Sequence, residues 1–175
     1  GRNLDVLVDA MQYVLNSSIV LVIIGDGKLL RPLQKRAQRQ ELPKRVYFFG
    51  AVAQDALLEL TASADAGVIP YQATCLNNYY CTPNKLFEFI AAGIPVLATD
   101  LPEIRKIVQG HDIGIVGDTR SPQTLAALMD DFFSDEERLS SWKARVLVAR
   151  QSICWDQEGK KLVDIYETLG SPRPT

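Results

Sequence analysis

The sequence predicts an α/β fold, a Rossmann-like doubly wound parallel sheet with helices on both faces, in three α/β/α layers. Three observations predict it. Short β-branched apolar runs alternate with longer amphipathic segments, as βα units do. The runs are continuously apolar, which is typical of strands in parallel sheets. The 175 residues, 47% of them hydrophobic, suffice for one domain of this class.

The first part of the chain is expected to contain three helices and three strands. Apolar residues at 4, 7, 8, 11, 14 and 15 recur with helical spacing, which predicts a helix over 3–15. The β-branched run 19–24 predicts a strand buried on both faces, closed by a tight turn at Gly25 and Gly27. The expected elements that follow are a helix over 28–40, a strand over 46–49, a helix over 54–62 and a strand over 66–69.

A polar loop over 70–82 separates these elements from the second part of the chain. Two helix starts are well signalled there: Ser121, an N-cap followed by Pro122, and Ser134, whose spacing to Glu137 is that of a capping box. The remaining expected elements are helices over 83–92, 103–108 and 156–169 and strands over 95–98 and 113–116. The domain is predicted over 1–170, followed by a proline-containing tail over 171–175 that cannot continue a helix.

Charge, apolar runs and cysteine spacing argue against several classes of function. The formal charge is −2 and no run of Lys and Arg exceeds two residues, so nucleic acid is not an expected partner. Apolar runs are too short to span a bilayer and the N-terminus lacks signal-peptide order, which predicts a cytoplasmic domain. Three cysteines without CxxC spacing predict free thiols rather than disulfides or a zinc site.

The segment that carries chemistry is 82–88. Thr82 is expected as a helix N-cap and Pro83 as the first helical residue, which leaves the amides of Asn84 and Lys85 free at the positive end of the helix dipole. The Lys85 ammonium favours a diphosphate there, and Glu88, one turn on, can accept from a ribose hydroxyl. A capped helix with an ion pair between Lys85 and Glu88 on its solvated face is the alternative.

This region resembles the signature of glycosyltransferase family 4, in which a helix bearing a glutamate leads into Ala-Ala-Gly-x-Pro-Val. Here Glu88 is followed by that sequence over 91–96. The family motif has another glutamate eight positions earlier, which usually contacts the transferred sugar; this chain has Tyr80 there, so that acid is absent. The order and spacing of weaker motifs extend the resemblance over nearly the whole chain.

The resemblance implies the C-terminal, nucleotide-sugar-binding half of a retaining, two-domain GT-B glycosyltransferase. Such an enzyme, of hexosyltransferase type, transfers a sugar from a nucleoside-diphosphate sugar to an acceptor hydroxyl without a metal ion or cofactor. Lys85 and Glu88 are the implied catalytic residues, with Glu88 on the ribose. The resemblance also implies that Arg2 and Lys85 contact the pyrophosphate and that Phe49 lies next to the nucleotide base. The full set of implied donor-binding residues is Arg2, Gly25, Gly27, Phe49, Thr82, Asn84, Lys85, Leu86 and Glu88.

The family would also place other parts before this chain. Its acceptor domain, which binds a saccharide or lipid, precedes the present segment, so the chain alone should bind donor without completing the reaction. Membrane contact, at the inner face, is expected only through that absent domain. The first strand of the sheet, central in the order 3-2-1-4-5-6, would end just before Arg2, which leaves a vacant position or one that a neighbouring chain fills.

Three other functions stay open. Gly25 and Gly27 between a strand and a helix suggest a dinucleotide-dependent oxidoreductase, although Leu30 stands where GxGxxG has its third glycine. Tyr80 in place of the first glutamate suggests a non-catalytic interaction module. A sugar-nucleotide epimerase shares the two-domain architecture. The donor base, the sugar and the acceptor are not determined by the sequence.

Overall fold

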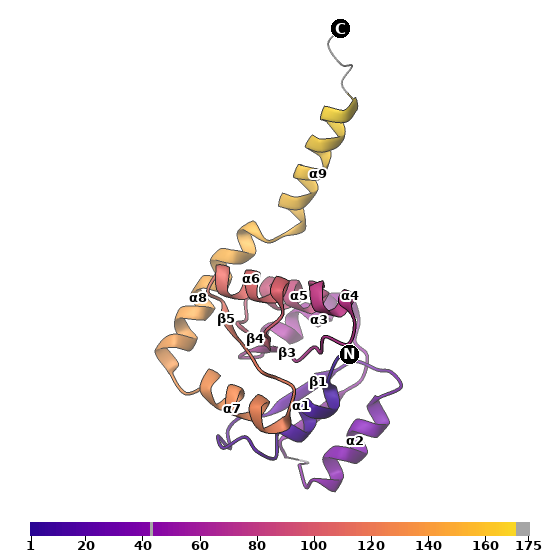
Figure 1. Ribbon diagram of the computed structural model, residues 1–175, viewed down its shortest axis with the longest axis vertical. Helices are drawn as coiled ribbons and strands as arrows, with labels where there is room; N and C mark the ends of the chain where they lie inside the picture. The colour runs from indigo at the N-terminus through magenta and orange to yellow at the C-terminus, as the bar shows by residue number, and fades with distance from the viewer. Residues whose placement is uncertain (43, 171–175) are drawn as a thin grey trace.

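The computed structural model describes residues 1–42 and 44–170. Two parallel sheets lie between layers of helices, and a last helix projects away from the body (Figure 1). The α/β class and the parallel strand arrangement are as predicted. The predicted tail over 171–175 lies outside the described residues.

The first sheet contains β1 (Leu21–Ile24) and β2 (Val46–Phe49), paired in parallel with Leu21 opposite Val46. Helices α1 (Leu4–Ala10) and α2 (Leu30–Arg39) pack against each other beside it. Their buried side chains join those of the strands in one core. Phe132 and Trp142, from the C-terminal helices, belong to the same core, and their ring centroids lie 4.9 Å apart. This cluster holds the N-terminal half together.

The second sheet has the order β3-β4-β5, all parallel, built from β3 (Gly67–Ile69), β4 (Val96–Thr99) and β5 (Gly114–Gly117). Its helices are α3 (Gln54–Ala62), α4 (Leu76–Tyr80), α5 (Asn84–Ala92) and α6 (Pro102–Gly110). The strands thus form two sheets, where the sequence predicted one. The expected strand immediately before Arg2 stays a prediction.

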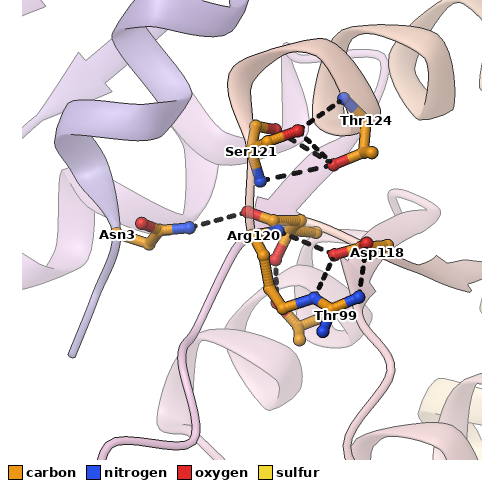
Figure 2. A network of polar contacts seen from close by, with 7 residues as sticks. Asn3, Thr99, Asp118, Arg120, Ser121 and Thr124 are labelled. Atoms are coloured by element: carbon orange, nitrogen blue, oxygen red, sulfur yellow. Dashed lines mark hydrogen bonds and ion pairs between the residues drawn. The ribbon is translucent and has the colours of Figure 1, made fainter.

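The chain closes with α7 (Pro122–Phe132), α8 (Glu136–Ser152) and α9 (Trp155–Gly170). Ser121 caps α7 as predicted, in a reciprocal capping box with Thr124 (Figure 2). The predicted cap of α8 at Ser134 is wrong by one residue: Asp135 accepts from the Arg138 amide at 3.0 Å, because the Ser134 hydroxyl is already bonded to the Asp131 carbonyl.

The predicted helix over 3–15 is too long. Helix α1 ends at Ala10, and Leu15 is 89% exposed. Tertiary partners replace the helical hydrogen bonds beyond this point: the Asp130 carboxylate accepts from the amides of Leu15 and Asn16, at 2.9 and 3.0 Å. The guanidinium of Arg45 donates to carbonyls of the same segment, including that of Val14 at 3.1 Å.

The expectation that the strand over 19–24 is buried on both faces is also wrong. Leu21 is buried, whereas Val22 is 47% exposed, as are Tyr47 and Phe49 on the same face of β2. Helix α3, which follows β2, packs on α5 and buries none of its own residues. One face of the first sheet therefore stays uncovered in the described chain.

Candidate functional site

The carboxyl ends of parallel strands are the natural place to look for a ligand site, since ligands of open α/β sheets bind there. Five connections leave these ends. The Gly25–Gly27 turn follows β1, the segment 50–53 follows β2, the segment 70–82 follows β3, Asp100 follows β4 and Asp118 follows β5. Most of the predicted site residues lie on these connections or on the helices that they enter.

Helix α5 begins at Asn84, one residue later than expected. The N-cap is Pro83, with extended backbone (φ −70°, ψ 141°), and no side chain caps the helix. The prediction that Thr82 is the N-cap is therefore wrong: the buried Pro83 is itself extended and takes the N-cap position. The segment before it, expected as a loop, contains the short helix α4.

Two free amides remain at the start of α5. The amide of Leu86 donates to the Pro83 carbonyl at 2.9 Å. Those of Asn84 and Lys85 belong to the first turn, where a helix offers no acceptor, and no bond to them occurs among the described residues. The N-terminal end of α5 thus presents two donors and the positive end of the helix dipole.

The side chains of α5 divide by function. Leu86 and Ile90 are fully buried and fix the helix in the core. Asn84 and Glu88 are exposed and Lys85 is half-buried. Within the described chain, Lys85 forms no ion pair with Glu88, contrary to the alternative of a purely structural pair. Leu86, by contrast, offers a ligand no side chain.

Arg2 is held at the same edge by its neighbours. The Gln72 amide donates to the Gly1 carbonyl at 2.9 Å, and the Gln72 side-chain amide donates to the Asn3 side chain at 2.7 Å. Asn3 in turn donates to the Thr119 carbonyl at 2.8 Å, the link drawn in Figure 2 to the backbone before Arg120. The residues on both sides of the exposed Arg2 are thereby tied to the ends of β3 and β5.

Buried hydroxyls complete this network beneath Arg2. The Thr99 and Thr119 hydroxyl oxygens lie 2.5 Å apart, and Thr99 also donates to the Ile69 carbonyl at 3.3 Å. Thr119 is fully buried, and Asn3 is 6% exposed. These bonds join the ends of β3, β4 and β5, so the edge of the second sheet is rigidly connected to the N-terminal segment.

Asp118 and Arg120 form an ion pair next to this network (Figure 2). The Arg120 guanidinium and backbone amide both donate to Asp118, which lowers the pKa of that carboxyl to about 2. Asp118 is consequently ionised across the physiological range. Arg120 compensates its charge at the end of β5.

Gly25, Gly27 and Phe49 form a second group at the end of the first sheet. Both glycines have positive φ angles, 133° and 145°, that other residues rarely adopt. The Gly25 amide donates to the Phe49 carbonyl at 3.1 Å, and the Phe49 ring is 54% exposed. No hydrogen bond or ion pair between described residues joins this group to α5 or Arg2.

Helix α4 links the N-terminal segment to α5. A Cβ atom at Gly1 would lie 2.5 Å from the Asn78 side chain, so the N-terminus rests directly on α4. Tyr80, which replaces the first motif glutamate, is 60% exposed at the end of α4 and contacts Tyr79 edge to face. A hydroxyl-bearing aromatic ring therefore stands where the family motif has an acid.

Sequence reasoning missed Asn3, Gln72, Thr99 and Thr119. A signal was present for Thr99, the polar last residue of the otherwise apolar strand β4. Asn3 bonds Gln72 and Thr119 across separations of 69 and 116 residues, which no local pattern records.

The described residues also bear on disulfides, metal sites and membrane spans. The cysteines Cys75, Cys81 and Cys154 are free thiols, as predicted. No cluster of three His, Cys, Asp or Glu side chains suited to a metal occurs in 1–42 and 44–170. Within the same ranges, none of the helices combines the length and apolarity that crossing a membrane requires.

Solved structures of similar fold include glycosyltransferases. HepE of Anabaena in complex with UDP superimposes with a TM-score of 0.80 at 17% identity, over 95% of this chain and 45% of that one. The C-terminal domain of LpcC, a group 1 family protein of Francisella tularensis, gives a TM-score of 0.67 at 17% identity, over 86% of this chain and 78% of that one. The fold is that of the C-terminal, Rossmann-like domain of a GT-B glycosyltransferase.

The sequence comparison gives the family. The family described as "Glycosyl transferases group 1" matches residues 2–146, and the chain belongs to it. A GDP-mannose-dependent alpha-(1-6)-phosphatidylinositol monomannoside mannosyltransferase of Mycobacterium tuberculosis is 31% identical over 165 residues, 91% of this chain and 43% of its own. The chitobiosyldiphosphodolichol beta-mannosyltransferase of Candida albicans is 25% identical over 163 residues, which cover 89% of this chain and 35% of that protein. The chain thus spans less than half the length of these relatives.

Proposed function

We propose that this chain is the donor-binding domain of a retaining glycosyltransferase that transfers a hexose from a nucleoside-diphosphate sugar to an acceptor hydroxyl. The observation that carries the proposal is the start of α5, where the free amides of Asn84 and Lys85 stand beside the Lys85 ammonium and the exposed Glu88. Amides and a cation at a helix N-terminus suit a diphosphate, and a carboxylate one turn further suits ribose hydroxyls.

Each site residue has a definite part in this proposal. Lys85 and Arg2 stabilise the negative charge that develops on the departing diphosphate, and Glu88 accepts from the ribose. The Gly25 and Gly27 turn allows close approach of the backbone to the nucleotide, and Phe49 borders the base. No metal ion or cofactor has a role, since helix-end amides and cations take over charge stabilisation. Thr82, which does not cap α5, and Leu86, whose side chain is buried, can contribute only through exposed surface or backbone atoms.

The relatives support a nucleotide sugar as the donor class without agreeing on its base. One is named as GDP-mannose-dependent, whereas the HepE structure contains UDP. We further propose that a preceding domain, present in the longer relatives, binds the acceptor saccharide or lipid, that this chain alone completes no transfer, and that the protein acts in the cytoplasm.

Calorimetric titration of the chain with UDP, GDP, ADP and NAD tests the donor site. We expect one nucleoside diphosphate to bind selectively, and Glu88→Ala to weaken it by about 1.5–3 kcal/mol, the worth of a hydrogen bond to a charged group. Glu103→Ala is the matched control, because Glu103 is a carboxylate in the first turn of another helix, α6. Equal affinity of wild type and Glu88→Ala would remove Glu88 from the site, and selective binding of NAD would favour an oxidoreductase.

A further inference from the structure

The strongest feature outside the candidate site is the charge on α2. Four of the ten residues of this helix are cations and none is acidic, in a chain whose net charge is −2. Arg31, Lys35 and Arg39 recur every four residues and form one exposed row about 12 Å long, at 1.5 Å per residue. We call these three residues, with Lys28 at the start of the row, the cationic face of α2.

Arg36, the fourth cation of the helix, forms an ion pair within the protein. Its guanidinium donates to both carboxylate oxygens of Asp9 on α1, which raises the pKa of Arg36 and lowers that of Asp9. The cationic face itself has no such partner: none of its four residues forms an ion pair within the described part of the chain. An open hollow of about 640 Å³ lies over it, lined by Lys28, Arg31, Pro32, Lys35, Arg36 and Arg39.

The stability of α2 does not account for this arrangement. Like charges four residues apart destabilise a helix, and the row contains two such pairs, Arg31 with Lys35 and Lys35 with Arg39. Arg31 also lies in the first turn, at the positive end of the dipole, where no acidic residue offsets it. The helix is held instead by Leu33 and Ala37, which are buried on its opposite side.

The neighbouring residues favour a phospholipid surface over nucleic acid. Leu29, directly before α2, is 56% exposed and can enter the headgroup layer beside the cations. The segment 28–45 contains no aromatic residue on which a base could stack. A short row of cations with an adjacent apolar side chain matches a plane of anionic headgroups.

We propose that the cationic face of α2 binds the anionic phospholipid headgroups of a membrane surface. The donor-binding domain then contacts the membrane itself, whereas the sequence-based expectation confined membrane contact to an absent domain. In Figure 1, α2 lies at the end of the molecule opposite α9.

Vesicle co-sedimentation of the chain tests the proposal. We expect binding to phosphatidylcholine vesicles that contain phosphatidylglycerol and none to pure phosphatidylcholine. Binding should disappear in about 1 M salt, where the Debye length is ~3 Å. The triple variant Arg31→Glu, Lys35→Glu, Arg39→Glu should bind at least about 100-fold more weakly, given the usual contribution of each basic residue near an anionic surface.

The matched control is Lys106→Glu, Arg150→Glu, Lys160→Glu, which makes the same charge change at exposed residues of α6, α8 and α9. It should bind vesicles as the wild type does, and circular dichroism should show both variants folded. Equal loss in both variants, or none in the α2 variant, would overturn the proposal.

Soluble competitors show whether the cationic face binds a ligand other than phospholipid. Inorganic phosphate and UDP should leave vesicle binding unchanged; displacement by either would mean that the face belongs to a phosphate or donor site. Tight binding of a nucleic acid oligonucleotide without vesicle binding would assign the face to nucleic acid instead. The donor titration is independent of these measurements, so either proposal can fail alone.

Discussion

Replacement of Asn3 by alanine should destabilise the chain far more than its position near the terminus suggests. Asn3 is 6% exposed and makes two side-chain bonds, to the Thr119 carbonyl at 2.8 Å and from Gln72 at 2.7 Å. Its backbone has a left-handed φ of 55°, which asparagine tolerates better than alanine does. The variant therefore loses two contacts and gains backbone strain.

The magnitude follows from these three terms. Each lost hydrogen bond costs about 1 kcal/mol net, and a buried carbonyl left without its donor raises this toward the 1–3 kcal/mol range. An alanine in the left-handed region adds about 1 kcal/mol. We expect Asn3→Ala to lower the free energy of unfolding by about 3 kcal/mol.

Urea denaturation followed by circular dichroism measures this change, with an unchanged m-value as the sign that only stability was altered. Asn3→Gly is the control, because glycine removes the same side chain without the left-handed strain. It should recover about 1 kcal/mol of the loss. A loss below about 1 kcal/mol in Asn3→Ala, or identical stability of the two variants, would refute the reasoning.

Two further predictions concern the fold. Hydrogen bonds from Arg36 hold the pKa of Asp9 below its ordinary value of 3.8, so this pair stabilises the protein above that pH and its contribution is lost on acidification. In urea titrations over acidic pH, Asp9→Asn should be less stable than wild type near neutrality and the gap should narrow as the pH falls; a gap that widens would contradict the pairing. Ending the chain at Cys154 removes α9, whose side chains such as Trp155 and Leu169 are 76% exposed. The free energy of unfolding should change by no more than about 0.5 kcal/mol, and a larger loss would mean that α9 packs on the body.

Local patterns predicted most of the elements because their causes are local. Strand β2 and helix α3 have the predicted bounds. Ser121 followed by Pro122 marked the start of α7, since a cap and its helix lie within four residues of each other. The placement of Lys85 and Glu88 on one helix was also predictable, because nearby residues signal that helix, and their role in donor binding stays a prediction.

The sequence-based predictions were wrong mainly where contacts with residues distant in the sequence determine the local structure. The helical pattern over 3–15 continues past Ala10, but Asp130 and Arg45 bind the backbone beyond it. The strand over 19–24 is apolar throughout, yet Val22 is exposed because α3 packs on α5 instead of covering it. Thr82 has the right type for an N-cap, and the packing of Pro83 moved the helix start past it.

The charge pattern shows the same division. Along the chain neutral residues interrupt the cations of α2 and only Lys35 and Arg36 are adjacent, so no run exceeds two and the sequence reads as mixed. Only the helix, with 3.6 residues per turn, places Arg31, Lys35 and Arg39 in one row, and only the fold brings Asp9 to the neighbouring Arg36.

The sequence by itself determined the α/β class, the family resemblance and the helix that carries Lys85 and Glu88, since periodicity, caps and motifs depend on residues close together in the chain. The tertiary structure alone decided how the sheet edge is assembled. Asn3, Gln72 and Thr119 meet there because parallel strands bring their carboxyl ends to one edge, and hydrogen bonds across 69 and 116 residues then hold the segment around Arg2 in place.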